Sequence, residues 1–446
     1  MASKSKRARG VKHRNLAKDF MYWAIAVFII KLIIIGNIQG GAWLGADGEN
    51  YLKGFDALVT DGIFSKETTL NYWPAGYPLF IFFLYLFSKS FVLISLSVVQ
   101  SAIFSYAAYF FASQLVKTRL KKFALLCFLM ILLNPTLSLS SMVIGYESLT
   151  ASGYLIIAGL ILKDFVGKDE DKFLLYVVIS SGIFGFMTFI QPRLIVSGFL
   201  INLLWIFTRK PWRLASLFIA ISLVITLFAP LSLVYRNHVA SGLNTISTNL
   251  GSTMNIGAGD KAVGGYAINN FGVDCVTRGN DSEKDSQLVL CILKWYLTNP
   301  TKTVKLIYNK SEFFWSPWKG PLVNGTMARN PWLKIHPISN IQSTPDGDKL
   351  VRGPIGIFIS WIWLLSGLFL VIYGYKVLWR SKSLERFIGS IAGVAIGTSW
   401  LISLATIGDH RFRLPIMGMS LFLQAVGIRT LLKGGKPPMV DGPGLR

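Results

Sequence analysis

Residues 214–235, LASLFIAISLVITLFAPLSLVY, form a run without a single charged side chain. A helix rises 1.5 Å per residue, so roughly 20 apolar residues cross the hydrocarbon core of a bilayer, which is about 30 Å thick. Uncharged runs of this length recur at residues 91–116, 123–146, 173–192, 353–375 and 387–408. Core helices of soluble proteins do not repeat at this length, so the sequence predicts a multi-pass membrane protein.

Composition supports this class. Of the 446 residues, 52% are hydrophobic and only 15% are charged, whereas about a quarter of the residues in soluble domains are charged. The net charge of +23 does not indicate nucleic acid, because the positive residues form short clusters between apolar runs instead of one basic face. The clusters therefore report on topology, and no nucleic-acid partner is expected.

The positive clusters fall in every other loop. They lie in residues 1–18, 117–122, 163–172, 209–213, 376–386 and 429–436. By the positive-inside rule these segments are cytoplasmic, as are both termini, and the first span is a retained anchor in the plasma (inner) membrane. About ten spans follow, near residues 20–39, 91–116, 123–140, 148–163, 173–191, 194–209, 214–235, 353–376, 387–408 and 414–430.

The expected fold is thus an all-α integral membrane protein in five segments. These are a basic cytoplasmic N-terminus (1–19), a transmembrane region (20–235) with a first outer loop (40–76), a large extracytoplasmic loop (236–352), a second transmembrane region (353–430) and a cytoplasmic tail (431–446). Residues 77–88 are apolar but too few to cross, so we expect a re-entrant or interfacial helix at the outer face.

This topology gathers ionisable side chains from four separate turns on the outer side. They are Asp47, Glu49, Glu147, Arg193, Asp409, His410, Arg411 and Arg413. The spans that follow at 148–162, 194–208 and 414–428 have only 15 uncharged residues each. Either basic residues at their inner ends snorkel, or their outer acids and arginines line a cavity below the surface. Lys31, within the first span, either snorkels outward or contacts a phosphate.

The large outer loop carries several further signals. Residues 251–265 are rich in glycine, but no strand and helix frame them as a nucleotide site. Residues 285–311 have the spacing of two amphipathic helices. FFWSPW at 313–318, with Trp332, is typical of an interfacial aromatic patch, the alternative being a carbohydrate-stacking surface.

Cysteines and motifs exclude several chemistries. Cys275 and Cys291 share this loop and can pair in an oxidising compartment, but they lack a histidine at metal-binding spacing. GxSxG, Walker A and HExxH sequences are absent, which argues against esterase, nucleotide-driven and zinc-protease activity. Acids and arginines at a membrane surface instead suit sugar transfer from a lipid phosphate, in which a carboxylate accepts a proton and arginine stabilises the departing phosphate.

Several stretches resemble one family in the same order along the chain. GADGENYL (45–52), YWPAGYPLF (72–80), NPTLSLSSMVIGYESL (134–149), YRNHVASG (235–242) and DHRFRLPI (409–416) resemble landmarks of the polytopic glycosyltransferases of the GT-C fold. The similarity is to the protein-mannosyltransferase-like and aminoarabinose-transferase-like group, glycosyltransferase family 39. It implies transfer of a hexose or pentose from a polyprenyl-phosphate donor, in the bilayer, to an acceptor hydroxyl on a protein, lipid or envelope glycan.

The resemblance also implies roles for individual residues. Asp47 corresponds to the proposed general base and Glu147 to the second outer acid, while Glu49 stays the rival of Asp47. Substrate-binding roles are implied for Tyr51, Tyr77, Arg193, Arg236, Asp409, His410, Arg411 and Arg413. Gln191, Pro192 and Arg193 depart from the family's Arg-Pro turn. No cofactor is implied, and a divalent metal stays open. A secondary transporter or lipid flippase is the alternative, although no internal repeat is visible, and a structural envelope protein is a third possibility.

Overall fold

A computed structural model describes residues 16–45, 47–167, 170–265, 272–315, 354–381 and 383–433. The N-terminal basic cluster up to residue 15, Trp318 and Trp332 of the predicted aromatic patch, and the tail beyond residue 433 lie outside these ranges.

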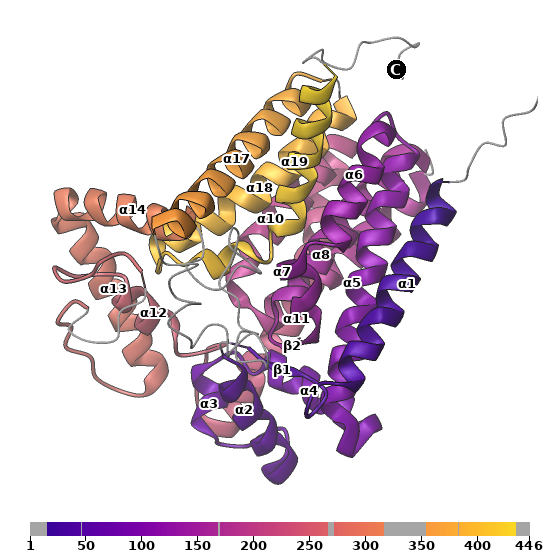
Figure 1. The fold of residues 1–446 in the computed structure, drawn as a ribbon. Helices are drawn as coiled ribbons and strands as arrows, with labels where there is room; N and C mark the ends of the chain where they lie inside the picture. Colours follow the sequence, from indigo (N-terminus) through magenta and orange to yellow (C-terminus); the bar gives the residue numbers. More distant parts are fainter. Residues whose placement is uncertain are drawn as a thin grey trace, which may run out of the picture.

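The described residues form a helical bundle (Figure 1). Eight of its helical stretches are long and apolar enough to cross a membrane, and a ninth qualifies if a bent pair counts as one span. The long helices are α1 (Leu16–Gly36), α5 (Val92–Val116), α8 (Glu147–Gly167), α9 (Phe173–Ile190), α10 (Ile195–Arg209), α11 (Trp212–Ser241), α17 (Pro354–Trp379) and α18 (Ser383–Ala405). The shorter apolar helix α19 (Met417–Leu432) completes the set. This confirms the all-α membrane fold.

The arrangement of the bundle follows from burial. α8 is the most enclosed of the candidate spans and packs against α5, α9, α18 and α19, because its small and apolar side chains face neighbours on every side. α1, α11 and α17 lie at the periphery and expose apolar side chains, as lipid-facing helices do. The start of α1 and the end of α19 lie at the same end of the bundle, which requires an even number of crossings (Figure 1).

The expected span at residues 123–140 is broken by a bend in the structure. The structure has α6 (Lys121–Leu132), then a bend of 56°, then α7 (Pro135–Leu139) and a 3₁₀ turn, η2 (Ser140–Met142). Pro135 has no backbone N–H for the helix, and the Asn134 side chain accepts a hydrogen bond from Leu137 N at 2.9 Å. The Asn-Pro pair therefore ends one helix and begins another.

The predicted short apolar helix at 77–88 is α4 (Gly76–Ser88). After it, Lys89 adopts a φ of 40° and the 3₁₀ turn η1 (Lys89–Phe91) leads into α5. The chain reverses direction at this turn. This is shown by a 3.1 Å hydrogen bond from Tyr77 in α4 to Gln100 in α5, which two residues so far apart in one straight helix could not form. α4 is thus a separate helix folded back on the bundle.

Two short strands interrupt the otherwise helical chain and were not predicted. β1 (Trp43–Leu44) pairs in parallel with β2 (Val143–Ile144), with Trp43 opposite Val143 and Leu44 opposite Ile144. The pair lies near α2 (Gly48–Asp61), α3 (Thr68–Tyr72) and α4 at the end of the bundle opposite the termini (Figure 1).

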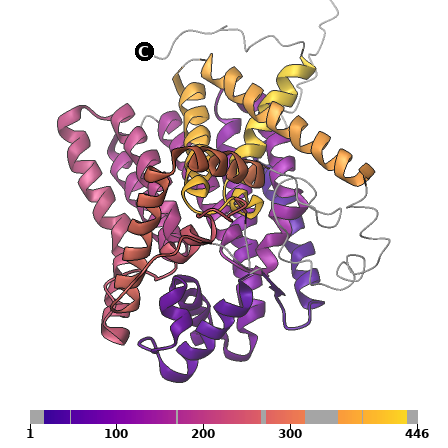
Figure 2. The same cartoon turned by 90° about the vertical axis from the view of Figure 1, so that its left-hand side faces the viewer.

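Three helices of the large loop lie at this end. They are α12 (Leu250–Ile256), α13 (Asp281–Thr298) and α14 (Pro300–Trp315), the last two confirming the predicted amphipathic pair. Asn280 and Glu283 form a capping box at the start of α13, and Cys275 forms a disulfide with Cys291. Figure 2 shows α14 in front of the C-terminal helices and above α2 and α3.

The aromatic segment at the end of α14 is partly a core element. Phe314 is fully buried in a cluster with Ile407 and Phe412, and the Trp315 ring lies 6.2 Å from the Trp400 ring. Phe314 is therefore not part of an exposed patch of either predicted kind.

Candidate functional site

The parallel strand pair brings two acids together. Each strand is followed by a glycine, and three residues after its last residue comes an acid: Leu44 leads to Asp47, and Ile144 leads to Glu147. Because Leu44 and Ile144 are register partners, the acids occupy equivalent places beside each other. Asp47 is the residue immediately before α2, and Glu147 is the first residue of α8.

The glycines permit this approach. A Cβ on Gly45 would lie 2.3 Å from the backbone oxygen of Ile144, and one on Gly145 would lie 2.4 Å from Glu147 Oε2. Neither distance is tolerated by a real Cβ. At Gly45 the neighbour is backbone, so the strands can come this close only because that position lacks a side chain. At Gly145 the neighbour is the end of the Glu147 side chain, which a methyl group would displace.

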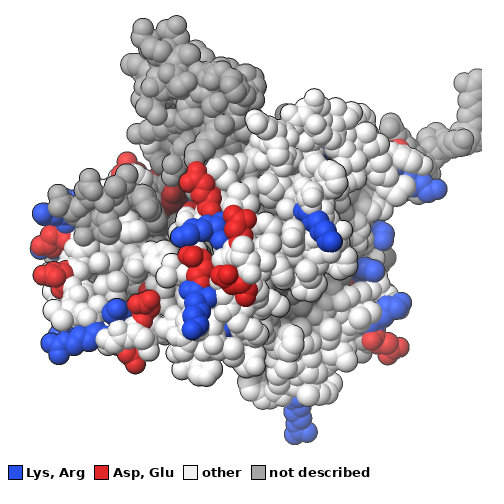
Figure 3. Space-filling view, turned by 90° about the horizontal axis from the view of Figure 1, so that it is seen from below, with Lys and Arg blue, Asp and Glu red and all other residues white. Residues whose placement is uncertain are grey.

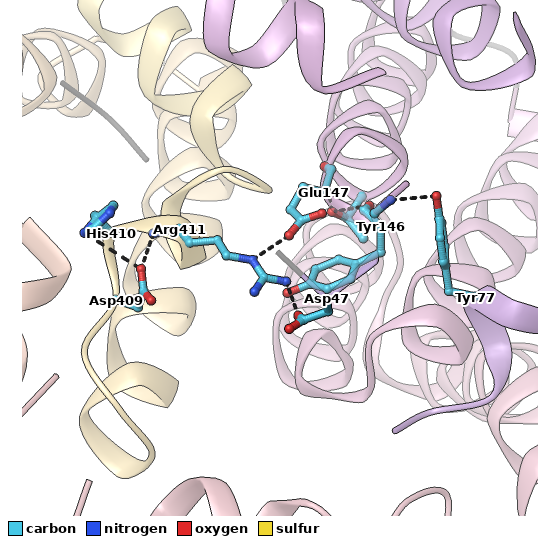
Figure 4. A network of polar contacts seen from close by, with 9 residues as sticks. Asp47, Tyr77, Tyr146, Glu147, Asp409, His410 and Arg411 are labelled. Carbon is cyan, nitrogen blue, oxygen red and sulfur yellow. Dashed lines mark hydrogen bonds and ion pairs between the residues drawn. The ribbon is translucent and has the colours of Figure 1, made fainter. Parts of the chain in front are cut away.

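Arg411 joins the two acids. It lies in η7 (His410–Arg413), the 3₁₀ turn between α18 and α19, and its guanidinium extends between the carboxylates (Figure 4). Nε donates to Glu147 Oε1 at 2.7 Å and Nη2 donates to Asp47 Oδ2. The turn itself is fixed because Asp409 Oδ1 accepts from Arg411 N at 2.8 Å.

The electrostatics of this triad follow from its burial. The side chains of Arg411, Asp47 and Glu147 are 11%, 19% and 5% exposed, so solvent screens their interaction weakly. Burial by itself would lower the pKa of Arg411, but the charges of Asp47 and Glu147 oppose this effect and raise the pKa well above its usual value. The guanidinium is permanently charged here.

A second arginine lies close by on another turn. The Arg193 guanidinium is 3.9 Å from the centre of the Phe412 ring, and Phe412 directly follows Arg411 in the sequence. The side-chain amide of Gln191 is oriented with its oxygen toward Tyr146 and Arg193. In this orientation it accepts hydrogen bonds from Tyr146 Oη at 2.8 Å and from Arg193 Nε at 3.3 Å. Burial raises the pKa of Tyr146 although Arg193 and Arg411 oppose the shift. The turn after α9, which departs from the family pattern, thus still brings an arginine to the acids.

A cavity of about 610 Å³ opens beside the triad. One wall carries Asp47, Tyr51 and Arg193. Other parts of the cavity wall come from the α3–α4 connection, with Trp73 and Pro74, from the segment around residues 245–250, and from α12, α13 and the end of α18. A volume of this size is typical of small-ligand sites. Seen from this end, charged side chains of both signs gather near the middle of a largely uncharged face (Figure 3).

The two rival acids of the first outer loop point differently. Asp47 lines the cavity, whereas Glu49 is an exposed residue in the first turn of α2 and is not among the cavity residues. Tyr51 N donates to Asp47 O at 3.1 Å, and the Tyr51 side chain is buried on the cavity wall. Burial raises the pKa of Tyr51 well above its usual value, and the nearby Asp47 charge adds to the shift.

Asp285 and Trp73 also line the cavity and were not predicted as site residues. Asp285 on α13 lines the cavity and accepts from Gly251 N at 2.7 Å, and burial raises its pKa against the effect of the backbone donors. Trp73 provides an aromatic wall. Trp73 lies within the quoted stretch 72–80 and could have been found there; Asp285 has no local signal, because its partner is 34 residues away.

Other predicted site residues lie apart from the cavity wall. Arg236 is buried and donates to Ile63 O, Ser65 O, Asn71 Oδ1 and Asn237 Oδ1, so it ties the first outer loop to the end of α11. Asn237 in turn donates to Thr245 O and Ile246 O, which belong to a segment of the cavity wall. Arg236 therefore stabilises the cavity wall indirectly, through its hydrogen bond to Asn237.

The remaining residues of η7 surround Arg411. His410 Nδ1 lies 3.8 Å from Asp409 Oδ1. Arg413 is buried, 5.9 Å from the Trp315 ring, and lines a narrow crevice between α17 and α19. Burial lowers the pKa of Arg413 to about 9, and Asp409 opposes that shift.

The structure distinguishes between the two explanations for the short spans. Glu147 and Arg413 are buried and Arg193 lines the cavity, as the cavity explanation requires. The snorkelling explanation requires Arg209 to extend toward the inner surface. Instead, Arg209 forms an ion pair with buried Asp164 at 2.8 Å. Lys31 does not snorkel outward: it is buried, with Nζ 3.0 Å from Ser141 Oγ.

Within the described ranges, no group of three or more His, Cys, Asp and Glu side chains could hold a metal ion. The positive charge between Asp47 and Glu147 is supplied by Arg411.

The described chain is a multi-pass helical membrane protein with an acid–arginine–acid triad at one end of its bundle. No family model and no curated protein matches it. Among solved structures, the chain is similar to the archaeal oligosaccharyltransferase AglB from Archaeoglobus fulgidus, in complex with an inhibitory peptide and a dolichol-phosphate, with a TM-score of 0.45 and 13% identity. The similarity covers 96% of this chain and 53% of AglB, so this chain spans about half the length of that structure. It concerns the course of the helices.

Proposed function

We propose that the chain is a membrane glycosyltransferase. It transfers a sugar from a polyprenyl-phosphate donor to an acceptor hydroxyl on the extracytoplasmic face by general-base displacement. The observation that carries the proposal is Arg411, held between Asp47 and Glu147 beside a cavity large enough for a sugar unit.

Asp47 is the base in this proposal. Of the two triad acids, it is the one that lines the cavity, where an acceptor hydroxyl can reach it. The acceptor oxygen forms a bond to the anomeric carbon while its proton passes to the Asp47 carboxylate. The bond from the anomeric carbon to the phosphate oxygen breaks, and its electron pair leaves with the polyprenyl phosphate.

Arg411 stabilises that leaving group. Two of its N–H donors are engaged by the acids, whereas Nη1 makes no hydrogen bond to any described residue. A phosphate bound there competes with Asp47 for the guanidinium and so increases the basicity of Asp47 when the donor is present. Arg193, on the cavity wall, supplies the second positive charge. Glu147 is too buried to meet the acceptor, and it holds Arg411 in place.

The side of the membrane is supported by two independent features. The positive-inside pattern places the large loop outside. The Cys275–Cys291 disulfide lies in that loop, and disulfides persist in oxidising compartments.

Labelling of single cysteines in intact cells tests this sidedness. Thr60 is exposed on α2. A cysteine at Thr60 is expected to react with an impermeant maleimide and one at Ser381 is not. The reverse pattern would invert the topology and remove the proposed site from the outer face.

The direct test of the activity uses purified protein and a panel of polyprenyl-phosphate sugars with peptide, lipid and glycan acceptors. Release of the polyprenyl phosphate together with a glycosylated acceptor is the expected result. Movement of an intact lipid across vesicles without release of its phosphate would instead identify a flippase.

A further inference from the structure

A network of buried side chains holds β2 on the side away from β1. Tyr77 Oη accepts from Gly145 N at 2.8 Å and donates to Gln100 Oε1 at 3.1 Å. The amide nitrogen of Gln100 donates to Val143 O at 2.9 Å. Two side chains from α4 and α5 thus bind the backbone of β2 and of the glycine that follows it.

The same segment is anchored at its start by α1. Lys31 Nζ donates to Ser141 Oγ at 3.0 Å and lies 4.2 Å from the centre of the Phe104 ring. Ser101 Oγ is also 3.0 Å from Ser141 Oγ. Every residue of this network is buried, so water does not replace these bonds.

The consequence for the site is geometric. A one-residue slip of a strand moves every following side chain, and the two strands here have only two pairs of register partners. Such a short ladder cannot fix its own register. The bonds from Tyr77 and Gln100 reach residues 143 and 145, directly before Tyr146 and Glu147, and therefore determine where the Glu147 carboxylate begins.

We propose that Tyr77 and Gln100 are positioning residues that keep β2 in register with β1 and thereby hold Glu147 against Arg411. Tyr77 was expected to bind substrate, yet it is fully buried, is absent from the cavity wall, and uses its hydroxyl as both donor and acceptor within the protein. The catalytic consequence rests on the proposed function, but the structural claim does not.

A cysteine pair measures the register directly. Adjacent strands lie about 4.8 Å apart, which is within the Cα separation that a disulfide spans. The matched pair Leu44→Cys/Ile144→Cys is compared with the offset pair Leu44→Cys/Val143→Cys under mild oxidation, with the bond identified by mass spectrometry of digested protein. The matched pair is expected to form its disulfide at least about tenfold faster, because the offset side chains point to opposite faces.

The network is then weakened by Tyr77→Phe. The preference for the matched pair is expected to fall to about one third of its value or less, since each lost buried hydrogen bond shifts an equilibrium about 3- to 10-fold. Tyr85→Phe is the matched control, with the same chemical change on the same helix at a hydroxyl that makes no hydrogen bond to a residue in the described ranges. An unchanged preference in Tyr77→Phe, or an equal fall in Tyr85→Phe, overturns the proposal. Gln100→Met provides the same comparison if Tyr77→Phe does not accumulate.

Kinetics supply the second measurement. Tyr77→Phe is expected to lower kcat about 10-fold with an unchanged KM for the lipid donor, because the cavity wall is intact. A raised KM with unchanged kcat would instead make Tyr77 a substrate contact. If wild-type protein shows no transfer at all, the proposed function fails while the cross-linking result still decides the positioning role.

Discussion

Replacing Arg411 with alanine is expected to lower the free energy of unfolding, because it removes the positive charge between two carboxylates. Arg411→Ala leaves two carboxylates next to each other, one almost inaccessible to water and the other 19% exposed. Removing one partner of a buried ion pair costs about 3–5 kcal/mol, because the remaining charge is uncompensated. Asp47 recovers part of its hydration, so we expect a loss of about 4 kcal/mol in the free energy of unfolding.

Arg411→Lys is expected to cost less. The charge is kept, but an ammonium cannot reproduce the fork that reaches both acids, and one hydrogen bond to a charged group contributes about 1.5–3 kcal/mol. Denaturant unfolding in mixed micelles, followed by tryptophan fluorescence, measures both variants. Arg213→Ala, at an exposed position at the start of α11, is the control and should stay within about 0.5 kcal/mol of wild type.

A double variant shows whether the loss comes from the carboxylates. Glu147→Gln removes one of the two charges, so Arg411→Ala/Glu147→Gln should be more stable than Arg411→Ala alone. If Arg411→Ala unfolds like wild type, or if the double variant is less stable than the single one, the triad is not an ionic unit.

Three further predictions concern other parts of the molecule. Gly145→Ala places a methyl group 2.4 Å from Glu147 Oε2 and should reduce transfer at least about tenfold, whereas Gly182→Ala, with open space around its Cβ, should not; equal activities would exclude the close-approach argument. Cys275→Ser opens a loop of 16 residues and should lower stability by about 3 kcal/mol, measured as faster amide exchange in α13, with unchanged exchange as the contradicting result. Burial lowers the pKa of Lys310 to about 7, so the unfolded chain binds the proton more tightly; stability should rise as pH increases from about 7 to 10 and should not depend on this group below about pH 7, and Lys310→Met should flatten the slope between pH 7 and 10 in denaturant titrations.

The helical framework could be predicted because the length of an uncharged run is a local property. The break between α6 and α7 also has a local cause, the Asn134–Pro135 pair, although the run of apolar residues concealed it. The alternation of positive clusters along the loops was enough to predict that Asp47, Glu147 and Arg411 lie on the same side of the membrane. It does not predict the distances between these three side chains.

The geometry of the site could not be predicted, because it depends on contacts between residues far apart in sequence. β1 pairs with a strand 100 residues later, and Arg411 reaches Glu147 across 264 residues. The stretches WLGAD at 43–47 and VIGYE at 143–147 share two apolar residues, a glycine and an acid three positions after the second apolar residue. That similarity is visible in the sequence, yet only the register gives it a meaning.

In the proposed mechanism, Asp47 accepts the proton of the acceptor hydroxyl. Asp47→Asn keeps the volume of the side chain and removes the base, and Glu49→Gln makes the same change at the exposed acid two residues away. With a verified polyprenyl-phosphate sugar and acceptor, Asp47→Asn is expected to reduce kcat by about 10²–10⁴ with donor binding preserved, while Glu49→Gln keeps most of the activity. Near-normal turnover in Asp47→Asn would contradict the account, and an inactive Glu49→Gln beside it would transfer the role of the base to Glu49.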